Sequence, residues 1–261
     1  MICKVCGTEK LRLLLNSRDI HGRHILSEDR FEVLECPDCS CAFTKIEVNL
    51  DYYKKYYKDD YFCEKNNSGL AGKLLLILQN FGFRARSSLI KRYAGDNARL
   101  LEIGCGRGDF LFYLPGSLKK SCVEINPGAV EFIKSKMKDI DIYSLRLDDK
   151  SEDISLLDGR FDIVLAWHSF EHFSDPVILF KNVNKTLDLN GVLIFSVPNK
   201  ASLGLRLAGE RWFHLDTPRH IVHYDRKSIE RIAQLSGFDI VEFRSSVVDY
   251  FHDLAASFYE R

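Results

Sequence analysis

Residues 100–109 read LLEIGCGRGD, and this segment decides the fold of the chain. The apolar residues 98–103 predict a buried parallel strand, and residues 109–114 predict the start of a helix. Glycines in the intervening turn allow positive φ angles and a close approach of the backbone to a ligand. A strand, a glycine-rich turn and a helix in this order predict the first unit of a doubly wound, mostly parallel α/β sheet.

The spacing of the glycines narrows the choice of ligand. Gly104, Gly106 and Gly108 are spaced G-x-G-x-G, whereas a dinucleotide-binding turn is spaced G-x-G-x-x-G before the helix that binds the pyrophosphate. Glu102 ends the strand, where a carboxylate would repel phosphates but can pair with an amino group. The pattern favours a cofactor without a pyrophosphate, and a nucleotide-binding Rossmann protein is the nearest alternative.

A second acidic residue has the position of a ribose-binding carboxylate. Glu124 belongs to SCVEI, residues 121–125, which reads as the second strand. A carboxylate that ends this strand, about 20 residues after the first, can accept hydrogen bonds from both ribose hydroxyls. A surface glutamate is the alternative interpretation of Glu124 taken alone.

Three further strands are predicted from apolar segments. Residues 140–145 predict the third strand, and Asp148 follows it, where a carboxylate could accept an adenine amino group. Residues 161–166 and 191–197 predict the fourth and fifth strands.

Two C-x2-C pairs lie near the amino terminus, about thirty residues apart. This is the spacing of a zinc ribbon, in which each pair wraps a turn and four thiolates surround one structural Zn²⁺. The predicted ligands are Cys3, Cys6, Cys36 and Cys39. Buried free thiols are the alternative, and a redox dithiol is less favoured because neither pair follows a βαβ strand. Ser40 and Cys41 follow the second pair where a ribbon usually has glycine, so Cys41 could compete as a ligand.

The segment after the predicted ribbon is rich in tyrosine and lysine. Residues 51–62 read DYYKKYYKDDYF, and residues 73–93 are apolar and then basic, so two helices are predicted here. A basic, tyrosine-rich helix could contact phosphates of a nucleotide-linked substrate or of RNA, and Tyr57 is the predicted substrate contact. The alternative is that the tyrosines pack on the core and the charges face water.

Composition and charge weigh against several classes of protein. The 261 residues include 37 basic and 37 acidic side chains, and the pI is about 7.1. This balance removes the overall positive charge that most nucleic-acid-binding proteins use. The longest aliphatic run, residues 74–78, is far shorter than the ~20 residues needed to cross a bilayer. No signal-sequence pattern is found, so a cytoplasmic location is expected.

Taken together, these segments resemble class I S-adenosylmethionine-dependent methyltransferases that carry an amino-terminal zinc ribbon. LLEIGCGRGDFL is specific for the superfamily, and RWFHLDTPRHIVHYD is similar to one branch of it. The other segments that carry the resemblance are CKVC, CPDC, YYKKYYKDDYF, VEINP, FDIVLAWHSFEHFSDP and LNGVLIFSVPN. Enzymes of that branch often act in cell-surface polysaccharide or small-metabolite pathways, and some relatives resemble sugar C-methyltransferases that act on nucleotide-linked sugars.

The resemblance implies a Rossmann-like domain that binds S-adenosylmethionine. The implied parts are a zinc ribbon at 1–46, a helical connector or lid at 47–95, and the cofactor-binding domain at 96–261 with a substrate-side insertion at 201–226. His168 is implied to lie near the methionine end of the cofactor. The full set of implied cofactor contacts is Glu102, Gly104, Cys105, Gly106, Gly108, Glu124, Ile125, Asp148, Trp167 and His168.

The carboxyl-terminal segment departs from the resemblance. A complete domain of this class ends in an antiparallel hairpin of two strands. Residues 238–245 (FDIVEFRS) can supply the first of them, whereas residues 247–261 read as helix or irregular chain. The last strand is therefore expected to be absent or truncated.

Histidines beyond two strand ends are the predicted catalytic groups. Methyl transfer to oxygen or carbon requires a proton to be removed, and histidine suits this with its pKa near 6.5. Glu171 and His172 follow the fourth strand, and His220 and His223 follow the fifth, where ligands of open α/β sheets bind. We predict His220 as the general base and His172 as the next candidate. A purely structural hydrogen bond is the alternative for each histidine.

Two neighbours of these histidines are predicted to bind the substrate. Arg219 could pair with a substrate phosphate or carboxylate, and Tyr224 is a further predicted contact.

The leading functional hypothesis is a small-molecule methyltransferase that acts on a sugar or related metabolite. The alternatives are an RNA methyltransferase whose ribbon binds nucleic acid, and a non-catalytic module of the same fold. Residues 1–50 contain seven basic and eight acidic side chains, which offer phosphates no positive patch. The sequence predicts neither the acceptor atom nor the oligomeric state.

Overall fold

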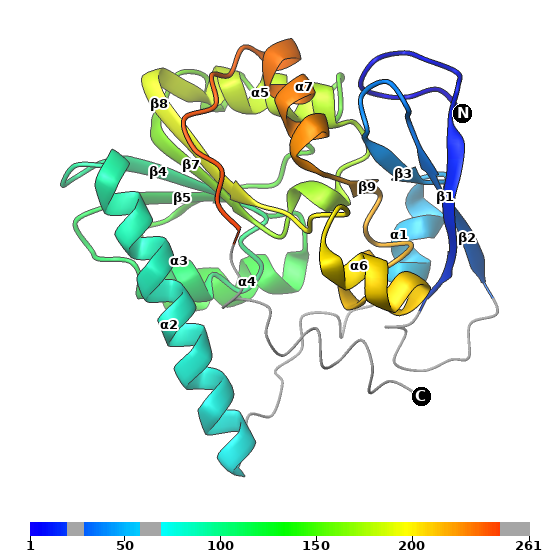
Figure 1. Cartoon of the computed structure of the whole chain (residues 1–261). Helices are drawn as coiled ribbons and strands as arrows, with labels where there is room; N and C mark the ends of the chain where they lie inside the picture. Colours follow the sequence, from blue (N-terminus) through cyan, green and yellow to red (C-terminus); the bar gives the residue numbers. More distant parts are fainter. Residues whose placement is uncertain (20–28, 58–68, 246–261) are drawn as a thin grey trace.

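The structure is a computed structural model that describes residues 1–19, 29–57 and 69–245 (Figure 1). At its centre lies a five-stranded parallel sheet in the order β6-β5-β4-β7-β8. These strands are β4 (Arg99–Ile103), β5 (Lys119–Val123), β6 (Asp141–Tyr143), β7 (Phe161–Trp167) and β8 (Leu187–Ser196). Because β4 is first in sequence but central in the sheet, the sheet is doubly wound, which confirms the predicted fold class.

Helices cover both faces of this sheet because its strands are apolar on both. Leu100 and Leu101 are adjacent in β4 and fully buried, but they point to opposite faces. Leu100 packs in one core cluster and Leu101 in the other. The helices on the Leu100 face are α2 (Gly69–Tyr93), α3 (Asp109–Tyr113) and α4 (Pro127–Lys136), and those on the Leu101 face are α5 (Pro176–Thr186) and α7 (Arg226–Ser236).

The amino-terminal part forms a separate antiparallel sheet in the order β1-β2-β3-β9. Its strands are β1 (Arg12–Arg18), β2 (Arg30–Glu35), β3 (Ala42–Thr44) and β9 (Val222–His223). The last strand comes from the region predicted as a substrate-side insertion, and sequence reasoning did not foresee this pairing. The ribbon sheet is thus completed by residues about 180 positions further along the chain (222 − 42).

A buried ion pair ties the ribbon to the main domain. Lys200 Nζ lies 2.7 Å from Glu35 Oε1 of β2 and 2.9 Å from Asp225 Oδ2, which caps α7. The Lys200 side chain is only 6% exposed, so loss of either carboxylate would leave a poorly compensated buried charge. The pair therefore fixes the relative position of the two sheets.

The connector contains the two predicted helices, α1 (Leu50–Tyr56) and α2. Part of the first predicted helix, residues 58–62, lies outside the described residues. The amino-terminal half of α2 projects away from the sheet, whereas its second half packs on it through Ile90 (Figure 1). The region between β8 and α7 adds α6 (Leu203–Ala208) and two short 3-10 turns.

The predicted strand over residues 238–245 is wrong, since these residues are neither helix nor strand. The segment alternates apolar and charged residues, but Ile240 and Val241 are 41% and 76% exposed. A strand needs a partner for its backbone groups, and in the described part of the chain the sheet ends at β8. Residues 247–261 lie outside the described residues.

Candidate functional site

The glycine turn after β4 has the backbone conformation that the sequence predicts. Gly104, Gly106 and Gly108 have φ angles of 67°, 55° and 77°, which lie in the left-handed region. A Cβ atom on Gly104 would lie 2.2 Å from Ser169 Oγ, which belongs to the loop after β7. Gly104 is therefore required twice, by its backbone angle and by the close approach of the neighbouring loop.

Glu102 is a buried acid with one oxygen that lacks a hydrogen-bond partner in the described part of the chain. It is 4% exposed, and its Oε2 has no hydrogen-bond partner among the described residues. Burial raises the pKa of this carboxyl group to about 8 because the charged form loses its hydration. A buried carboxyl oxygen without a hydrogen-bond partner beside a glycine turn suits a ligand that carries an ammonium group, which fits the methionine end of S-adenosylmethionine.

Trp167 and Arg86 lie on the same side of the sheet as Glu102. The Arg86 guanidinium stacks on the Trp167 ring, 4.7 Å from its centroid. Arg86 Nε and Trp167 Nε1 are both buried and find no hydrogen-bond partner in the described part of the chain. Sequence reasoning missed Arg86, which looked like one of several basic residues on a predicted helix.

Glu124 supports the turn from the second strand. Its Oε2 accepts a hydrogen bond of 2.9 Å from Gly106 N, and its Oε1 accepts one of 2.8 Å from Asn126 N. Burial raises the pKa of Glu124, although these two backbone N–H groups act in the opposite direction. The neighbouring Ile125 is 51% exposed and offers apolar surface to a planar base. Both features fit the ribose and adenine of the predicted cofactor.

The other predicted cofactor contacts lie around the same edge of the sheet. Asp148 is buried, and its Oδ2 accepts hydrogen bonds from the backbone N and the hydroxyl of Ser174. Cys105 is part of the glycine turn, and its pKa is raised by a hydrogen bond with Cys122 and by burial. His168 follows β7 with a φ of 51°. The residues present fit S-adenosylmethionine, and their individual contacts stay predictions.

Three of the predicted catalytic side chains meet beyond the end of β7. One ligating atom from each of Glu171, His172 and His220 falls within 4.8 Å of the other two. Glu171 Oε1 lies 3.9 Å from His220 Nε2, and the rings of His172 and His220 are 4.8 Å apart at an angle of 78°. Glu171 is 1% exposed and also lies 3.5 Å from His168 Nδ1.

Hydrogen bonds between chain segments bring these residues together. Ile221 N donates to the carbonyl of Glu171, and the Thr44 hydroxyl donates to the carbonyl of His220. Tyr57, at the end of α1, places its hydroxyl 3.0 Å from His172 Nδ1. The ribbon, the connector and the loop after β7 thus all contact the segment that carries His220. Sequence reasoning predicted His220 but missed these contacts.

Burial and neighbouring charges shift the pKa values of both His220 and Glu171 in this cluster. Burial and the neighbouring His172 lower the pKa of His220 to about 4, so this ring is neutral at pH 7. Burial alone would raise the pKa of Glu171, but the surrounding histidines, His168 first, hold it below its ordinary value. The cluster therefore combines a buried carboxylate with neutral imidazole.

That Arg219 binds a substrate anion stays a prediction, and the structure gives its guanidinium two protein partners. Its guanidinium pairs with Asp19 at 2.7 Å and with Asp216, and its side chain is 4% exposed. Two carboxylates already accept hydrogen bonds from the guanidinium N–H groups, so a phosphate would have to displace them. Asp216 is three residues from Arg219, but Asp19 is 200 positions away (219 − 19), and no local pattern indicated that second pairing.

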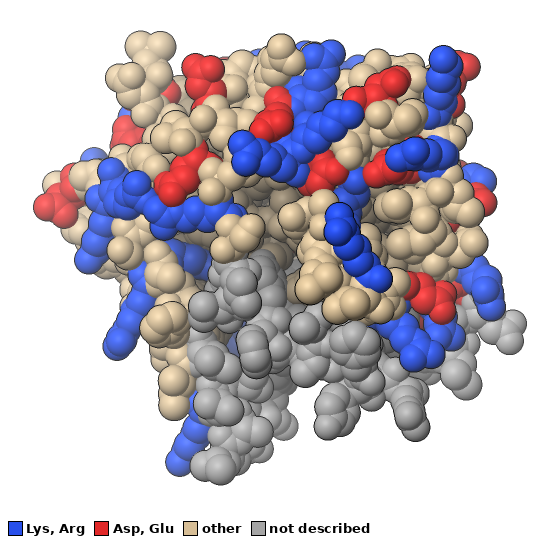
Figure 2. Space-filling model, in the orientation of Figure 1, with Lys and Arg blue, Asp and Glu red and all other residues tan. Residues whose placement is uncertain are grey.

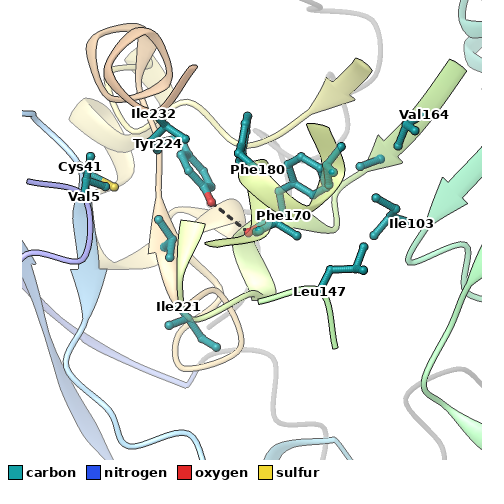
Figure 3. Packing of buried hydrophobic residues seen from close by; sticks show 14 of the residues in the cluster. Val5, Cys41, Ile103, Leu147, Val164, Phe170, Phe180, Ile221, Tyr224 and Ile232 are labelled. Carbon is teal, nitrogen blue, oxygen red and sulfur yellow. Dashed lines mark hydrogen bonds between the residues drawn. The ribbon is translucent and has the colours of Figure 1, made fainter. Parts of the chain in front are cut away.

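Tyr224 and His223 also have structural partners. Tyr224 is 1% exposed and its hydroxyl donates to the carbonyl of Phe170 at 3.1 Å (Figure 3), so this hydroxyl has a protein partner and its contact with substrate stays a prediction. His223 Nε2 lies 2.9 Å from the Thr44 hydroxyl between β9 and β3, and the ring is buried. His223 thus has a partner within the ribbon sheet, and its catalytic role stays a prediction.

The four predicted thiolates form a cluster in the ribbon. Cys3 and Cys39 have their sulfurs 3.5 Å apart, and those of Cys6 and Cys36 are 3.4 Å apart. These separations are close to the about 3.8 Å between sulfurs of a tetrahedral zinc site. Cys41 is buried but is not part of the cluster.

Ser40 occupies the turn position in which a ribbon usually has glycine. Gly7 and Ser40 follow the two cysteine pairs with φ angles of 76° and 65°, and their N–H groups donate to the carbonyls of Cys3 and Cys36. The Ser40 hydroxyl donates to Asp225. Ser40 thus combines a backbone angle that is unfavourable for a residue with a Cβ atom and a side-chain hydrogen bond to the main domain.

Comparisons with known proteins agree with this geometry. The sequence is 25% identical over 183 residues to a ubiquinone biosynthesis O-methyltransferase of Azorhizobium caulinodans, covering 67% of this chain and 70% of that protein. It is 31% identical over 151 residues to the thiol S-methyltransferase TMT1B of Rattus norvegicus, covering 54% of this chain and 61% of that protein. A crystal structure assigned as a sarcosine dimethylglycine methyltransferase from Galdieria sulphuraria superposes with a TM-score of 0.54 at 15% identity, covering 79% and 81% of the two chains.

The fold and the glycine turn define a class I methyltransferase domain. The Methyltransf_23 family model, described as a methyltransferase domain, matches residues 78–243, and the chain belongs to this family. The protein is therefore an S-adenosylmethionine-dependent methyltransferase with an amino-terminal four-cysteine cluster. None of the described helices combines the length and the apolar character needed to cross a membrane.

Proposed function

We propose that this methyltransferase acts on a hydroxyl oxygen of a small molecule, and that His220 removes the proton of that hydroxyl. A sugar or a nucleotide-linked sugar is the acceptor class that we propose. The observation that carries the proposal is the orientation of His220 beside the buried Glu171.

The hydrogen bonds of His220 determine which nitrogen can accept a proton. His220 Nδ1 lies 2.8 Å from the carbonyl of His214, and a carbonyl oxygen only accepts hydrogen bonds. Nδ1 therefore carries the hydrogen, and Nε2 has the lone pair. Since Nε2 is the nitrogen that faces Glu171, the imidazolium formed after proton transfer would be stabilised by a carboxylate.

S-adenosylmethionine, when bound, supplies a methyl group that is activated by the attached sulfonium. The chain contributes mainly alignment, which can lower a barrier by about 7 kcal/mol or more. Glu102 would hold the amino group and Glu124 the ribose hydroxyls. The close approach of Ser169 to Gly104 links the cofactor turn directly to the loop that carries Glu171.

The surface and the relatives favour a small acceptor over RNA. Lys and Arg lie beside Asp and Glu across the face seen in Figure 2, which gives no continuous positive surface there. The two curated relatives described above are named for O-methylation in ubiquinone biosynthesis and for thiol S-methylation. Because Arg219 is paired with two acids, a nucleotide-linked acceptor would have to hold its phosphates elsewhere.

We also propose that the four-cysteine cluster binds one structural Zn²⁺. Four cysteine thiolates form a closed tetrahedral shell without an open position for a substrate. The ion would stabilise the sheet that holds the His220 segment through Thr44.

The acceptor is tested by transfer of a labelled methyl group from S-adenosylmethionine to nucleotide-linked sugars, free sugars, catechols and total RNA. We expect a labelled small molecule. His220→Asn should lower turnover at least about 100-fold while cofactor affinity changes less than twofold, because asparagine can keep the bond to the His214 carbonyl but lacks Nε2. His223→Gln is the matched control and should retain turnover. Labelling of RNA alone would contradict the acceptor, and unchanged turnover in His220→Asn would remove His220 as the base.

A further inference from the structure

The cluster of Glu171, His172 and His220 has features that a general base alone does not require. A base needs one imidazole, but here two imidazoles and a carboxylate converge within 4.8 Å of one another. They come from two distant segments, since Glu171 and His172 follow β7 and His220 precedes β9. The convergence therefore depends on the tertiary structure and is not a consequence of sequence proximity.

Both histidines have the same tautomer. His172 Nδ1 lies 3.1 Å from the carbonyl of Arg219, and His220 Nδ1 lies 2.8 Å from the carbonyl of His214. Because carbonyl oxygens only accept, a hydrogen on each Nδ1 accounts for both contacts and leaves a lone pair on each Nε2. At His172 this tautomer also fits the Tyr57 hydroxyl, which lies 3.0 Å from Nδ1 and can itself donate to the Arg219 carbonyl. Histidines that bind metal ions usually donate their second ring N–H to a backbone carbonyl or carboxylate in this way.

The carboxylate of the cluster, Glu171, is buried and has few hydrogen-bond partners. Glu171 is 1% exposed, and neither of its oxygens has a hydrogen-bond partner of ordinary geometry among the described residues. Its nearest cationic candidate is His168 Nδ1 at 3.5 Å, at the limit of a hydrogen bond. A buried carboxylate normally pairs with a cation or coordinates a metal ion, so these oxygens point to a missing positive charge.

We propose that Glu171, His172 and His220 together bind one divalent metal ion, with the remaining coordination positions open to water and to the acceptor hydroxyl. Two imidazoles and one carboxylate suit first-row ions such as Mn²⁺, Fe²⁺ and Zn²⁺. This site is separate from the ribbon, whose four thiolates form a closed shell.

The distances allow such an ion after a small adjustment of side chains. Ligand atoms about 2.1 Å from a tetrahedral ion are about 3.4 Å from one another. Glu171 Oε1 and His220 Nε2 are 3.9 Å apart, so they need to approach by about half an ångström. All three ligand atoms lie within 4.8 Å of one another, so the most widely separated pair would have to approach by up to about 1.4 Å through side-chain rotation.

This inference rests on the hydroxyl acceptor of the proposed function and gives His220 a different role, as a metal ligand in place of the base. His220 Nε2 would bind the ion, and the ion would lower the pKa of the coordinated acceptor hydroxyl. The O–H bond would break with its proton going to solvent, and the oxygen would form the new bond to the methyl carbon. The methyl–sulfur bond breaks in the same step, and the sulfonium becomes a thioether. Proton transfer to His220 would then operate only in the metal-free protein.

The test is a titration of the full-length, zinc-loaded protein with Mn²⁺, followed by electron paramagnetic resonance. Mn²⁺ is the probe because it disfavours thiolates and would leave zinc in the ribbon. We expect one bound Mn²⁺ for each chain with a dissociation constant in roughly the micromolar range. Zn²⁺ should displace it, because Zn²⁺ binds the same ligands more tightly.

Three conservative variants locate the bound ion. Glu171→Gln, His172→Asn and His220→Asn should each weaken Mn²⁺ binding at least about tenfold. Both asparagines can retain the hydrogen bonds to backbone carbonyls, so the local structure is preserved. The control is His223→Gln, which should bind Mn²⁺ like the parent because His223 is bonded to Thr44. S-adenosylmethionine affinity reports folding in every variant.

The outcomes separate this inference from the proposed function. If the parent protein binds no Mn²⁺ but still methylates a hydroxyl acceptor with a chelator present, the metal site is refuted and the proposed function stands. Equal Mn²⁺ binding by the parent and the three variants also refutes the site. If Mn²⁺ binds with the expected variant pattern but no hydroxyl acceptor is labelled, the metal site stands and the proposed acceptor fails.

Discussion

Replacement of Glu102 by glutamine tests whether this buried acid is protonated before the cofactor binds. Its pKa is raised from 4.5 to about 8 by burial, so folding takes up a proton at pH 7. A group with a raised carboxyl pKa contributes its full stability below pH 4.5, loses it as the pH rises towards 8, and changes little above that. Each pH unit in this window corresponds to about 1.4 kcal/mol.

The size of the stability difference between the parent and Glu102→Gln follows from the pH range over which unfolding can be measured. Between pH 6 and pH 8 the parent protein should lose about 2.3 kcal/mol relative to Glu102→Gln, because glutamine does not ionise and Glu102 is half ionised in the folded protein at pH 8. In a chain of this size that corresponds to a relative shift in melting temperature of about 5–10 °C. Urea unfolding of the zinc-loaded, cofactor-free proteins at pH 6, 7, 8 and 9 measures the difference. It should grow up to about pH 8 and then level off.

The same group should release a proton when the cofactor binds. At pH 7 a carboxyl group with a pKa of about 8 is about 90% protonated, and pairing with an ammonium group would ionise it. Calorimetry in two buffers of different ionisation enthalpy should therefore find about 0.9 proton released for each S-adenosylmethionine bound, and none with Glu102→Gln. A stability difference that is constant with pH, together with no proton release, would refute the assignment of Glu102 as a buried, protonated acid.

Three further changes probe the site and its supports. Gly104→Ala should abolish detectable cofactor binding in calorimetry, since its Cβ would lie 2.2 Å from Ser169 Oγ at a φ of 67°; binding within threefold of the parent would contradict the steric argument. Arg219→Met should lower the free energy of unfolding in urea by about 3–5 kcal/mol because two acids lose their partner, whereas a change confined to the acceptor KM would restore a substrate role. Cys39→Ser should reduce zinc content and turnover together, because the ribbon holds the His220 segment; full turnover without zinc would separate the two.

The local parts of the molecule were predictable because their causes are local. The glycine turn follows from the φ angles that only glycine adopts easily, as at Gly108, and the central strands follow from their apolar runs. The four thiolates were predictable because a C-x2-C turn places both sulfurs on one side. The strand over residues 238–245 failed because alternation shows which faces a strand could present, and does not show whether a neighbour exists to pair with it.

The sequence by itself determined the fold class, the family and the positions of the cofactor turn and the cysteine cluster, since each is encoded within a few consecutive residues. Only the tertiary structure decided which groups lie beside the polar residues of the predicted site. Arg219 meets Asp19, and His220 meets Glu171, across 200 and 49 positions of sequence (219 − 19 and 220 − 171). Whether a charged side chain is free for a substrate depends on which distant groups the fold places beside it, and this information is absent from any local pattern.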